Sequence, residues 1–270
     1  MQEGAETAGH AYLQYATADR LRTRMETHRR FEERPADLDA ACALAMTLDG
    51  TKRILDVGCG TGQFLAGLAS RGHRGRLVGL DRSIAMIETA SAATNAVEWL
   101  VGDAAALPFA ASAFDWVSCR HVLFHVPAIP ATLAEIARVA GPVGRALFVT
   151  NSRRSLPIIY RLLEDVAVAF GLPEYHTPVE RFCVENARET LAPWFATVEE
   201  TIDENALVFN AAEPIVQYVL SCLPLPGQPD DPRLTGEMAA WVAAEVPKRL
   251  ASLGGRWRDA RNVGFYACKV

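Results

Sequence analysis

Short apolar runs alternate with helical patterns in the middle of the chain. The runs are rich in Val, Ile, Leu and Phe, as in buried strands, and lie at 54–57, 77–80, 97–101, 114–119 and 146–150. Helical patterns lie between them at 63–70, 83–93 and 130–139, where Ser83 can cap the second helix and Pro130 suits a first turn. Repeated strand–helix units joined by short loops predict an α/β fold, a parallel sheet covered by helices on both faces.

The flanks of this segment have mainly helical patterns. An arginine-rich, amphipathic helix is predicted over Tyr12–Arg30, and further helices over Leu156–Phe170, Val179–Trp194, Ala212–Leu223 and Arg233–Leu253. Strand-like residues occur at Thr197–Glu200, Ala206–Asn210 and Val263–Val270. The flanks therefore add helices to a central sheet.

A glycine-rich turn follows the first strand. Residues 54–64 read Ile-Leu-Asp-Val-Gly-Cys-Gly-Thr-Gly-Gln-Phe, so Gly58, Gly60 and Gly62 join a strand to a helix N-terminus. Such turns bind nucleotide-like ligands, and glycine permits both positive φ and close approach of a ligand. A dinucleotide site prefers G-x-G-x-x-G, and Asp56 would repel a pyrophosphate. We therefore expect a cofactor with a cationic or zwitterionic end.

Three acids follow successive strands of the predicted sheet. Asp56, Asp81 and Asp103 end the first, second and third strand, and the carboxyl ends of parallel strands share one edge, where ligands bind. Asp81 has the spacing from the glycine turn of an acid that accepts hydrogen bonds from ribose hydroxyls. Asp103 could accept from an adenine amino group, with the Ala104 amide facing a ring nitrogen.

Net charge and cysteine spacing exclude some classes of function. A net charge of −5 argues against a nucleic-acid partner. The six cysteines have no zinc-ligand spacing, so we expect no metal and a reducing, cytoplasmic location. The sequence shows neither a secretory signal nor an apolar run that would span a bilayer, so no membrane partner is expected. Either a monomer or a homodimer fits these features.

These motifs together resemble a known family. Leu-Asp-Val-Gly-Cys-Gly-Thr-Gly, Gly-Leu-Asp-Arg-Ser, Gly-Asp-Ala-Ala-Ala-Leu-Pro-Phe and Phe-Asp-Trp-Val-Ser occur in that order between Ile54 and Thr150. This stretch resembles the class I S-adenosylmethionine-dependent methyltransferases, in particular the small-molecule branch similar to the ubiquinone/menaquinone C-methyltransferases. The resemblance implies a Rossmann-like, seven-stranded, mostly parallel sheet whose last strand is antiparallel and lies beside the fifth.

The resemblance also implies the cofactor, S-adenosylmethionine, its product S-adenosylhomocysteine, and their binding residues. The glycine turn, including Cys59, would pass under the methionine part, and Asp56 would organise its amino end. Asp81, with Arg82 beside it, would bind the ribose, and Asp103 with Ala104 the adenine. The remaining contacts would come from Met86 and Leu107, which would pack on the two faces of the adenine. The main chain near Arg120 would bind the ammonium group of the cofactor, and Tyr15 would bind its carboxylate.

His121 is the candidate catalytic residue. It follows the fourth strand, whose end faces the donor methyl in this fold, and histidine can take a proton near neutral pH. His121 could act as a base, orient the acceptor, or pack beside the cofactor without titrating. His125 stands at helical spacing from His121, but no third metal ligand accompanies the pair.

The flanking helices are expected to bind the acceptor. Residues 1–50 would form a helical lid and lead-in, 51–150 the cofactor-binding core, 151–262 cap insertions, and 263–270 the final strand. Arg24 and His28 of the lid, with Tyr160, Tyr175 and His176 of the cap, could line a site for an apolar or aromatic molecule. The same aromatic residues also suit an ordinary core.

The leading functional hypothesis is transfer of a methyl group to a small molecule, such as a natural product or a quinone-like compound. The alternatives are a cyclase-like or decarboxylase-like enzyme on the same fold, or a nucleic-acid or protein methyltransferase. Amino-directed enzymes of the latter kind carry Asn/Asp-Pro-Pro-Tyr after the fourth strand, whereas residues 118–121 here read Ser-Cys-Arg-His.

Overall fold

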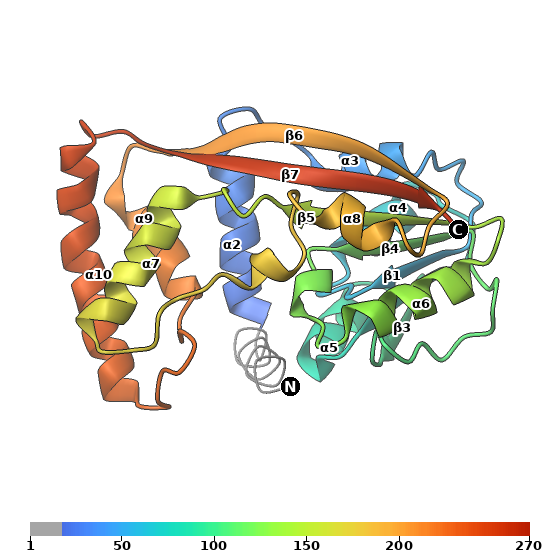
Figure 1. The fold of residues 1–270 in the computed structure, drawn as a ribbon, viewed down its shortest axis with the longest axis horizontal. Coiled ribbons are helices and arrows are strands. Elements are labelled where there is room, and N and C mark those ends of the chain that lie inside the picture. Colours follow the sequence, from blue (N-terminus) through green and yellow to red (C-terminus); the bar gives the residue numbers. More distant parts are fainter. Residues whose placement is uncertain (1–17) are drawn as a thin grey trace. The chain divides into compact units, whose positions relative to one another are not determined.

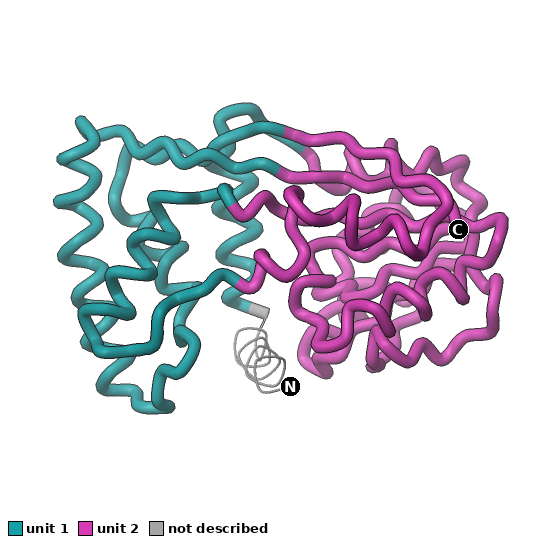
Figure 2. Tube along the Cα trace, viewed as in Figure 1, with its two compact units in different colours: residues 1–36, 154–177, 204–262 teal, residues 37–153, 178–203, 263–270 magenta. Residues whose placement is uncertain are grey.

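The computed structural model describes residues 18–270, which divide into two compact units (Figure 2). Unit 2 comprises residues 37–153, 178–203 and 263–270, and holds most of the sheet. Unit 1 comprises the described residues up to 36 together with 154–177 and 204–262, and is mainly helical.

A seven-stranded sheet is the framework of unit 2 (Figure 1). Its strands are β1 Ile54–Val57, β2 Leu77–Asp81, β3 Glu98–Val101, β4 Trp116–Arg120, β5 Arg145–Asn151, β6 Thr197–Phe209 and β7 Trp257–Lys269. They lie in the order β3-β2-β1-β4-β5-β7-β6; β1 to β5 are parallel to their neighbours, and β7 runs antiparallel to β5. The predicted α/β class, with a final antiparallel strand beside the fifth, is confirmed.

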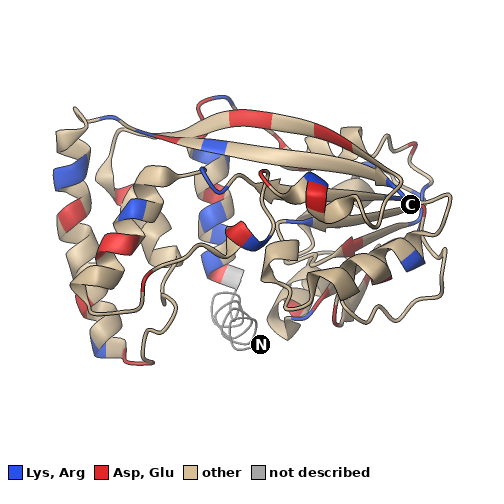
Figure 3. Cartoon of the chain, viewed as in Figure 1, with Lys and Arg blue, Asp and Glu red and all other residues tan. Residues whose placement is uncertain are grey.

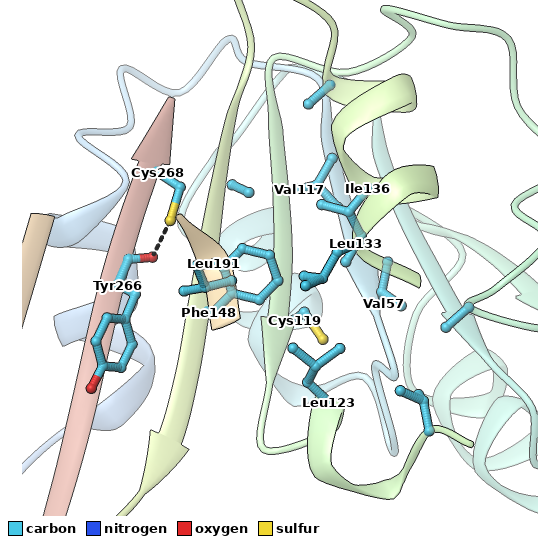
Figure 4. Packing of buried hydrophobic residues seen from close by; sticks show 14 of the residues in the cluster. Val57, Val117, Cys119, Leu123, Leu133, Ile136, Phe148, Leu191, Tyr266 and Cys268 are labelled. Atoms are coloured by element: carbon cyan, nitrogen blue, oxygen red, sulfur yellow. Dashed lines mark hydrogen bonds between the residues drawn. The ribbon is translucent and has the colours of Figure 1, made fainter. Parts of the chain in front are cut away.

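Alternating side chains of the strands bury both faces of this sheet. In β5, Phe148 packs on the face covered by α6 (Ile129–Ala140) and α8 (Ala187–Leu191). Figure 4 shows Phe148 with buried residues of β4, α6 and α8 around it. Leu147 and Val149 pack on the opposite face, against α3 (Leu38–Ala45) and α4 (Gln63–Ser70). The layers are therefore helix, sheet and helix, as predicted.

Two predicted elements of the flanks were wrong in extent. β6 is one continuous strand, although two strands were expected, with a break that included Asn205. The polar Asn205 side chain is buried there, and it hydrogen-bonds with both the main-chain N–H and the main-chain carbonyl of Arg34, so the strand continues through it. The helix expected over 179–194 is instead a 3₁₀ turn, η2 (Pro178–Arg181), and the short α8. There the Asn186 side chain binds the Cys183 amide and the Glu180 carbonyl, and so competes with helical hydrogen bonds.

Unit 1 packs four helices around one apolar core. They are α2 (Ala18–Phe31), α7 (Pro157–Ala169), α9 (Ala212–Ser221) and α10 (Pro232–Ser252), and the core includes Trp257 of β7. α7 begins after Leu156 without a side-chain cap of its own. Asp259 of β7 supplies the cap, since its carboxylate accepts from the amides of Ile158 and Ile159 at 3.1 and 2.8 Å.

Charged residues of both signs are mixed along the helices, as Figure 3 shows for α10. No helix among the described residues is long and apolar enough to cross a membrane. The first part of the predicted helix Tyr12–Arg30, with Tyr15, lies outside the described residues.

The aromatic contacts of Phe148 give a stability prediction for unit 2. Its ring lies 5.4 Å from that of Phe195 and 6.2 Å from that of Phe182, and it is fully buried. Phe148→Ala should lower the free energy of unfolding by about 3–5 kcal/mol, because it leaves a cavity. Val143→Ala, at a position 91% exposed, is the control in denaturant titrations. Equal midpoints for both variants would contradict the packing described.

Candidate functional site

The carboxyl ends of β1, β2, β3 and β4 lie together at one edge of the sheet in unit 2. The register aligns Asp56 with Gly79 of β2 and with Ser118 of β4, and it aligns Asp81 with Val101 of β3. The loops that follow these strands therefore begin side by side, as in open α/β sheets that bind ligands at this edge.

The glycine turn adopts the conformation that its sequence predicts. Gly58, Gly60 and Gly62 have φ values of 70, 55 and 76°. A Cβ atom on Gly58 would lie 2.3 Å from Val122, and one on Gly62 would lie 2.4 Å from Trp99. These two glycines are thus required by the internal packing of the turn, as well as by its left-handed backbone.

Asp81 holds the glycine turn and the start of the next helix together. One carboxylate oxygen accepts from the Gly60 amide and the other from the Ser83 amide, each at 2.9 Å. Ser83 in turn caps α5 (Ile84–Ala93), as predicted. Burial raises the pKa of Asp81, while the amides of Ser83 and Gly60 favour its charged form. Asp81 therefore has a structural role at the edge in addition to any contact with a ligand.

A buried guanidinium joins two carboxylates beside the turn. Arg120 donates to Asp56 at 2.9 and 3.3 Å and to Asp39 at 2.7 Å, and Ser118 donates to Asp56 at 2.6 Å. The guanidinium also lies 4.1 Å from the centre of the Phe64 ring. Burial opposes the charge on Arg120, but Asp56 offsets it, so the pKa of Arg120 is raised further above its usual range. The cation is therefore permanent.

A second ion pair, between Glu135 and Arg138 of α6, fixes the loop after β3. The Leu107 amide donates to Glu135 of α6 at 2.8 Å, and Arg138 donates to the carbonyls of Leu107 and Phe109. Asp103, at the start of this loop, is exposed and accepts from the Ala105 amide at 2.9 Å. Ala104 and Leu107 are buried. The predicted adenine contacts thus lie on a loop held in place by main-chain hydrogen bonds.

The other predicted cofactor residues differ in accessibility. Met86 is buried in α5, whereas Arg82 is exposed in the turn before it. Cys59 is buried, and burial together with Asp56 and Asp81 raises the pKa of its thiol well above the usual range. A thiol held in its neutral form is a poor nucleophile.

His121 adopts a strained backbone conformation just beyond β4. Its φ of 55° lies in the left-handed region, its amide donates to the Val149 carbonyl at 2.8 Å, and its side chain is partly exposed. Strain of this kind at a non-glycine residue is commonly associated with function. The following residues form a 3₁₀ turn, η1 (Leu123–His125), so His121 and His125 do not share the helix that their spacing suggested.

The predicted acceptor residues lie in unit 1. His28 of α2 lies 3.4 Å from the Tyr218 hydroxyl, and the rings of Tyr160 and Tyr175 are 6.3 Å apart. His176 is different: its side chain is 67% exposed and lies 3.8 Å from Glu174. The structure therefore brings three of these four residues into aromatic contacts, and leaves His176 at the surface.

Three of the residues that build the site, Asp39, Glu135 and Arg138, were not found from the sequence. Asp39 belongs to α3, a helix that was not predicted, although Asp37 caps it and is followed by an apolar residue. Glu135 and Arg138 carried a weak signal, an acid and a base three positions apart on a predicted helix. Among residues 18–270 we find no group of three or more His, Cys, Asp or Glu side chains that could hold a metal ion.

A family comparison agrees with this geometry. Residues 55–148 match the sequence model of a family described as "Methyltransferase domain". This segment therefore resembles a methyltransferase domain. The demethylmenaquinone methyltransferase of Lactococcus lactis is 39% identical over 117 residues, which cover 41% of this chain and 46% of that protein. The chain thus spans about half the length of this curated relative.

Solved structures share the fold over more of the chain. A candidate methyltransferase from Bacillus halodurans superposes with a TM-score of 0.59 at 17% identity, covering 87% of this chain and 99% of that one. The [4+2]-cyclase SpnF superposes with a TM-score of 0.54 at 23% identity, covering 86% and 80%. At these sequence identities the likeness establishes the fold alone. Because SpnF is a cyclase, proteins with this fold catalyse more than one kind of reaction.

The buried ion pair of Arg120 gives the second prediction. Arg120→Met should lower the free energy of unfolding by about 3–5 kcal/mol, because it leaves the buried Asp56 carboxylate without its cation. Arg53→Met is the matched control, since Arg53 pairs with Asp115 at 2.8 Å on the exposed surface of the same unit. The control should cost less than about 1 kcal/mol. Similar decreases in the free energy of unfolding of the two variants, measured by urea titration, would show that the buried pair stabilises the fold no more than the exposed pair.

Proposed function

We propose that this protein is an S-adenosylmethionine-dependent methyltransferase that acts on a small-molecule acceptor. The observation that supports it most is the meeting of the glycine turn with Asp81 at the carboxyl edge of the sheet, beside the loop of Asp103. The family match of residues 55–148 and the quinone-directed relative support the same reaction class.

The residues at this edge fit the proposed cofactor. Each oxygen of the Asp81 carboxylate accepts one amide, which leaves further lone pairs for ribose hydroxyls. The exposed Asp103 and the Ala104 amide would hold the adenine, with Met86 and Leu107 near its faces. The acids Asp56 and Asp39 exceed the single cation of Arg120, which suits a cationic ligand. When bound, the cofactor supplies an electrophilic methyl group on a sulfonium.

His121 would act on the acceptor rather than on the cofactor. It follows β4, at the same edge as Asp56 and Asp81, and its backbone is in the left-handed region. As a base, His121 would take the proton from an acceptor hydroxyl or ammonium, and the lone pair left on oxygen or nitrogen would form the new bond to carbon as the carbon–sulfur bond breaks. As an orienting group, it would hold that atom in line with the breaking carbon–sulfur bond.

We also propose roles for the remaining segments. Residues 1–50 would serve as a lid and lead-in, with Tyr15 on the cofactor carboxylate, and 151–262 would supply caps that select the acceptor. The second candidate function is a cyclase-like reaction on the same cofactor fold, which the likeness to SpnF favours. Label from the S-adenosylmethionine methyl group would reach a product only in the first case.

Cofactor binding is tested by calorimetry on the full chain. S-adenosylhomocysteine should bind without added metal, and Asp81→Ala should weaken it about 5- to 150-fold, since a hydrogen bond to a charged group is lost. Ser83→Ala is the control, because it removes the cap of α5 and leaves Asp81 in place. A parallel loss in both variants would indicate that Asp81 serves only the turn, and a folded wild-type chain that binds no cofactor would refute the proposed function.

The role of His121 is tested with His121→Asn, because asparagine tolerates the left-handed backbone that alanine does not. If His121 is a base, turnover should fall about 10²- to 10⁴-fold with little change in cofactor affinity. If it orients the acceptor, the Michaelis constant should change more than turnover. Wild-type kinetics in the variant at every pH would eliminate both roles.

A further inference from the structure

The loop that follows β4 packs directly on the glycine turn. An ideal Cβ atom on Gly58 would lie 2.3 and 2.6 Å from the two methyl carbons of Val122 and 2.9 Å from its Cβ atom. The Val122 side chain therefore fills the space that any side chain at position 58 would need. Gly58 follows β1 and Val122 follows β4, and these two strands are neighbours in the sheet. The contact thus joins the loop of the proposed cofactor residues to the loop of His121.

Hydrogen bonds to β2 set the position of the glycine turn. The amides of Gly58 and Cys59 both donate to the Leu80 carbonyl, at 2.7 and 3.1 Å. Gly58 itself is partly exposed, so the residue that Val122 contacts also remains open to a ligand. A ligand bound to the turn would therefore act on the same backbone against which Val122 packs.

His121 lies between this contact and the sheet. Its amide donates to the Val149 carbonyl at 2.8 Å, which extends the pairing of β4 with β5 by one residue. The residue after it, Val122, packs on Gly58. A histidine at φ 55° has a conformation that persists only where its surroundings impose it. The hydrogen bond and the valine are two such constraints, one on each side of the residue.

The far end of the same loop has its own support. Arg181 of η2 donates to the carbonyls of Phe124 and Pro127, at 3.2 and 3.0 Å. Phe124 is also buried in the core of unit 2. Loss of the contact between Val122 and Gly58 should therefore loosen residues 121 and 122 and leave the rest of the loop in place.

We propose that Val122 is a positioning residue, which couples the backbone of His121 to the glycine turn. This inference rests on the proposed methyltransferase function, in which the turn holds the cofactor and His121 acts on the acceptor. Packed side chains carry coupling of this kind between two parts of a site. The coupling is reciprocal, because cofactor on the turn favours one arrangement of His121 and that arrangement in turn favours the cofactor.

NMR spectra of the full chain with isotope-labelled histidine follow His121 directly, and His121→Asn identifies its signals. We expect S-adenosylhomocysteine to shift the ring and Cα signals of His121 in the wild-type chain. Val122→Ala removes the two methyl groups that pack on Gly58. In this variant the shift should be largely lost, and the His121 amide should exchange with solvent about 5- to 30-fold faster when no cofactor is present.

Two further variants serve as controls. Val126→Ala removes the same two methyl groups from a core residue of the same loop, and should leave both measurements at their wild-type values. Val122→Thr keeps the shape of valine, and the hydroxyl is tolerated because position 122 is partly exposed. This variant should preserve the cofactor-induced shift, and it tests the inference if Val122→Ala does not fold.

Each outcome bears on one proposal. The inference is overturned if Val122→Ala keeps either the wild-type shift or the wild-type exchange rate, if Val126→Ala changes them equally, or if Val122→Thr loses the shift. It is also overturned if S-adenosylhomocysteine binds in calorimetry without shifting the His121 signals. Failure of S-adenosylhomocysteine to bind to the folded chain would count instead against the methyltransferase function. Amide exchange is measured without cofactor, so it tests the hold of Val122 on His121 in either case.

Discussion

The candidate cofactor site depends on the neutralisation of buried charge at the carboxyl edge of the sheet. The Asp56 side chain is 1% exposed and is paired with Arg120, which in turn pairs with Asp39 and lies over the face of Phe64. These contacts connect β1, β4, α3 and α4. The turn of Gly58–Gly62 begins two residues after Asp56, so its position relative to the sheet is set by the same group of charges.

Charged side chains also hold the main chain of the other loops at this edge of the sheet. Asp81 binds amides of the glycine turn and of the α5 start, and Glu135 with Arg138 binds the main chain after Asp103. In each case a side chain from a regular element fixes the backbone of a loop. The loops are thereby ordered before any ligand arrives, which reduces the conformational entropy that binding must otherwise offset.

Much of this fold follows from local sequence, and much of the site does not. The strands 54–57 and 77–81 and the cap at Ser83 were predictable because apolar runs, glycine and capping residues act on near neighbours. The single strand β6 and the short α8 were not, because Asn205 and Asn186 are satisfied by partners that no local pattern reveals. Asp39 was missed for the same reason: its partner Arg120 lies 81 positions further along the chain.

The left-handed backbone of His121 has a consequence for which residues position 121 can accept. Valine, isoleucine and threonine are strongly disfavoured at φ 55°, so most apolar replacements at this position would carry a folding cost unrelated to their chemistry. Glycine, asparagine and aspartate are the residues that the backbone accepts readily. Evolution at position 121, in nature or in the laboratory, would therefore be confined largely to histidine, glycine, asparagine and aspartate.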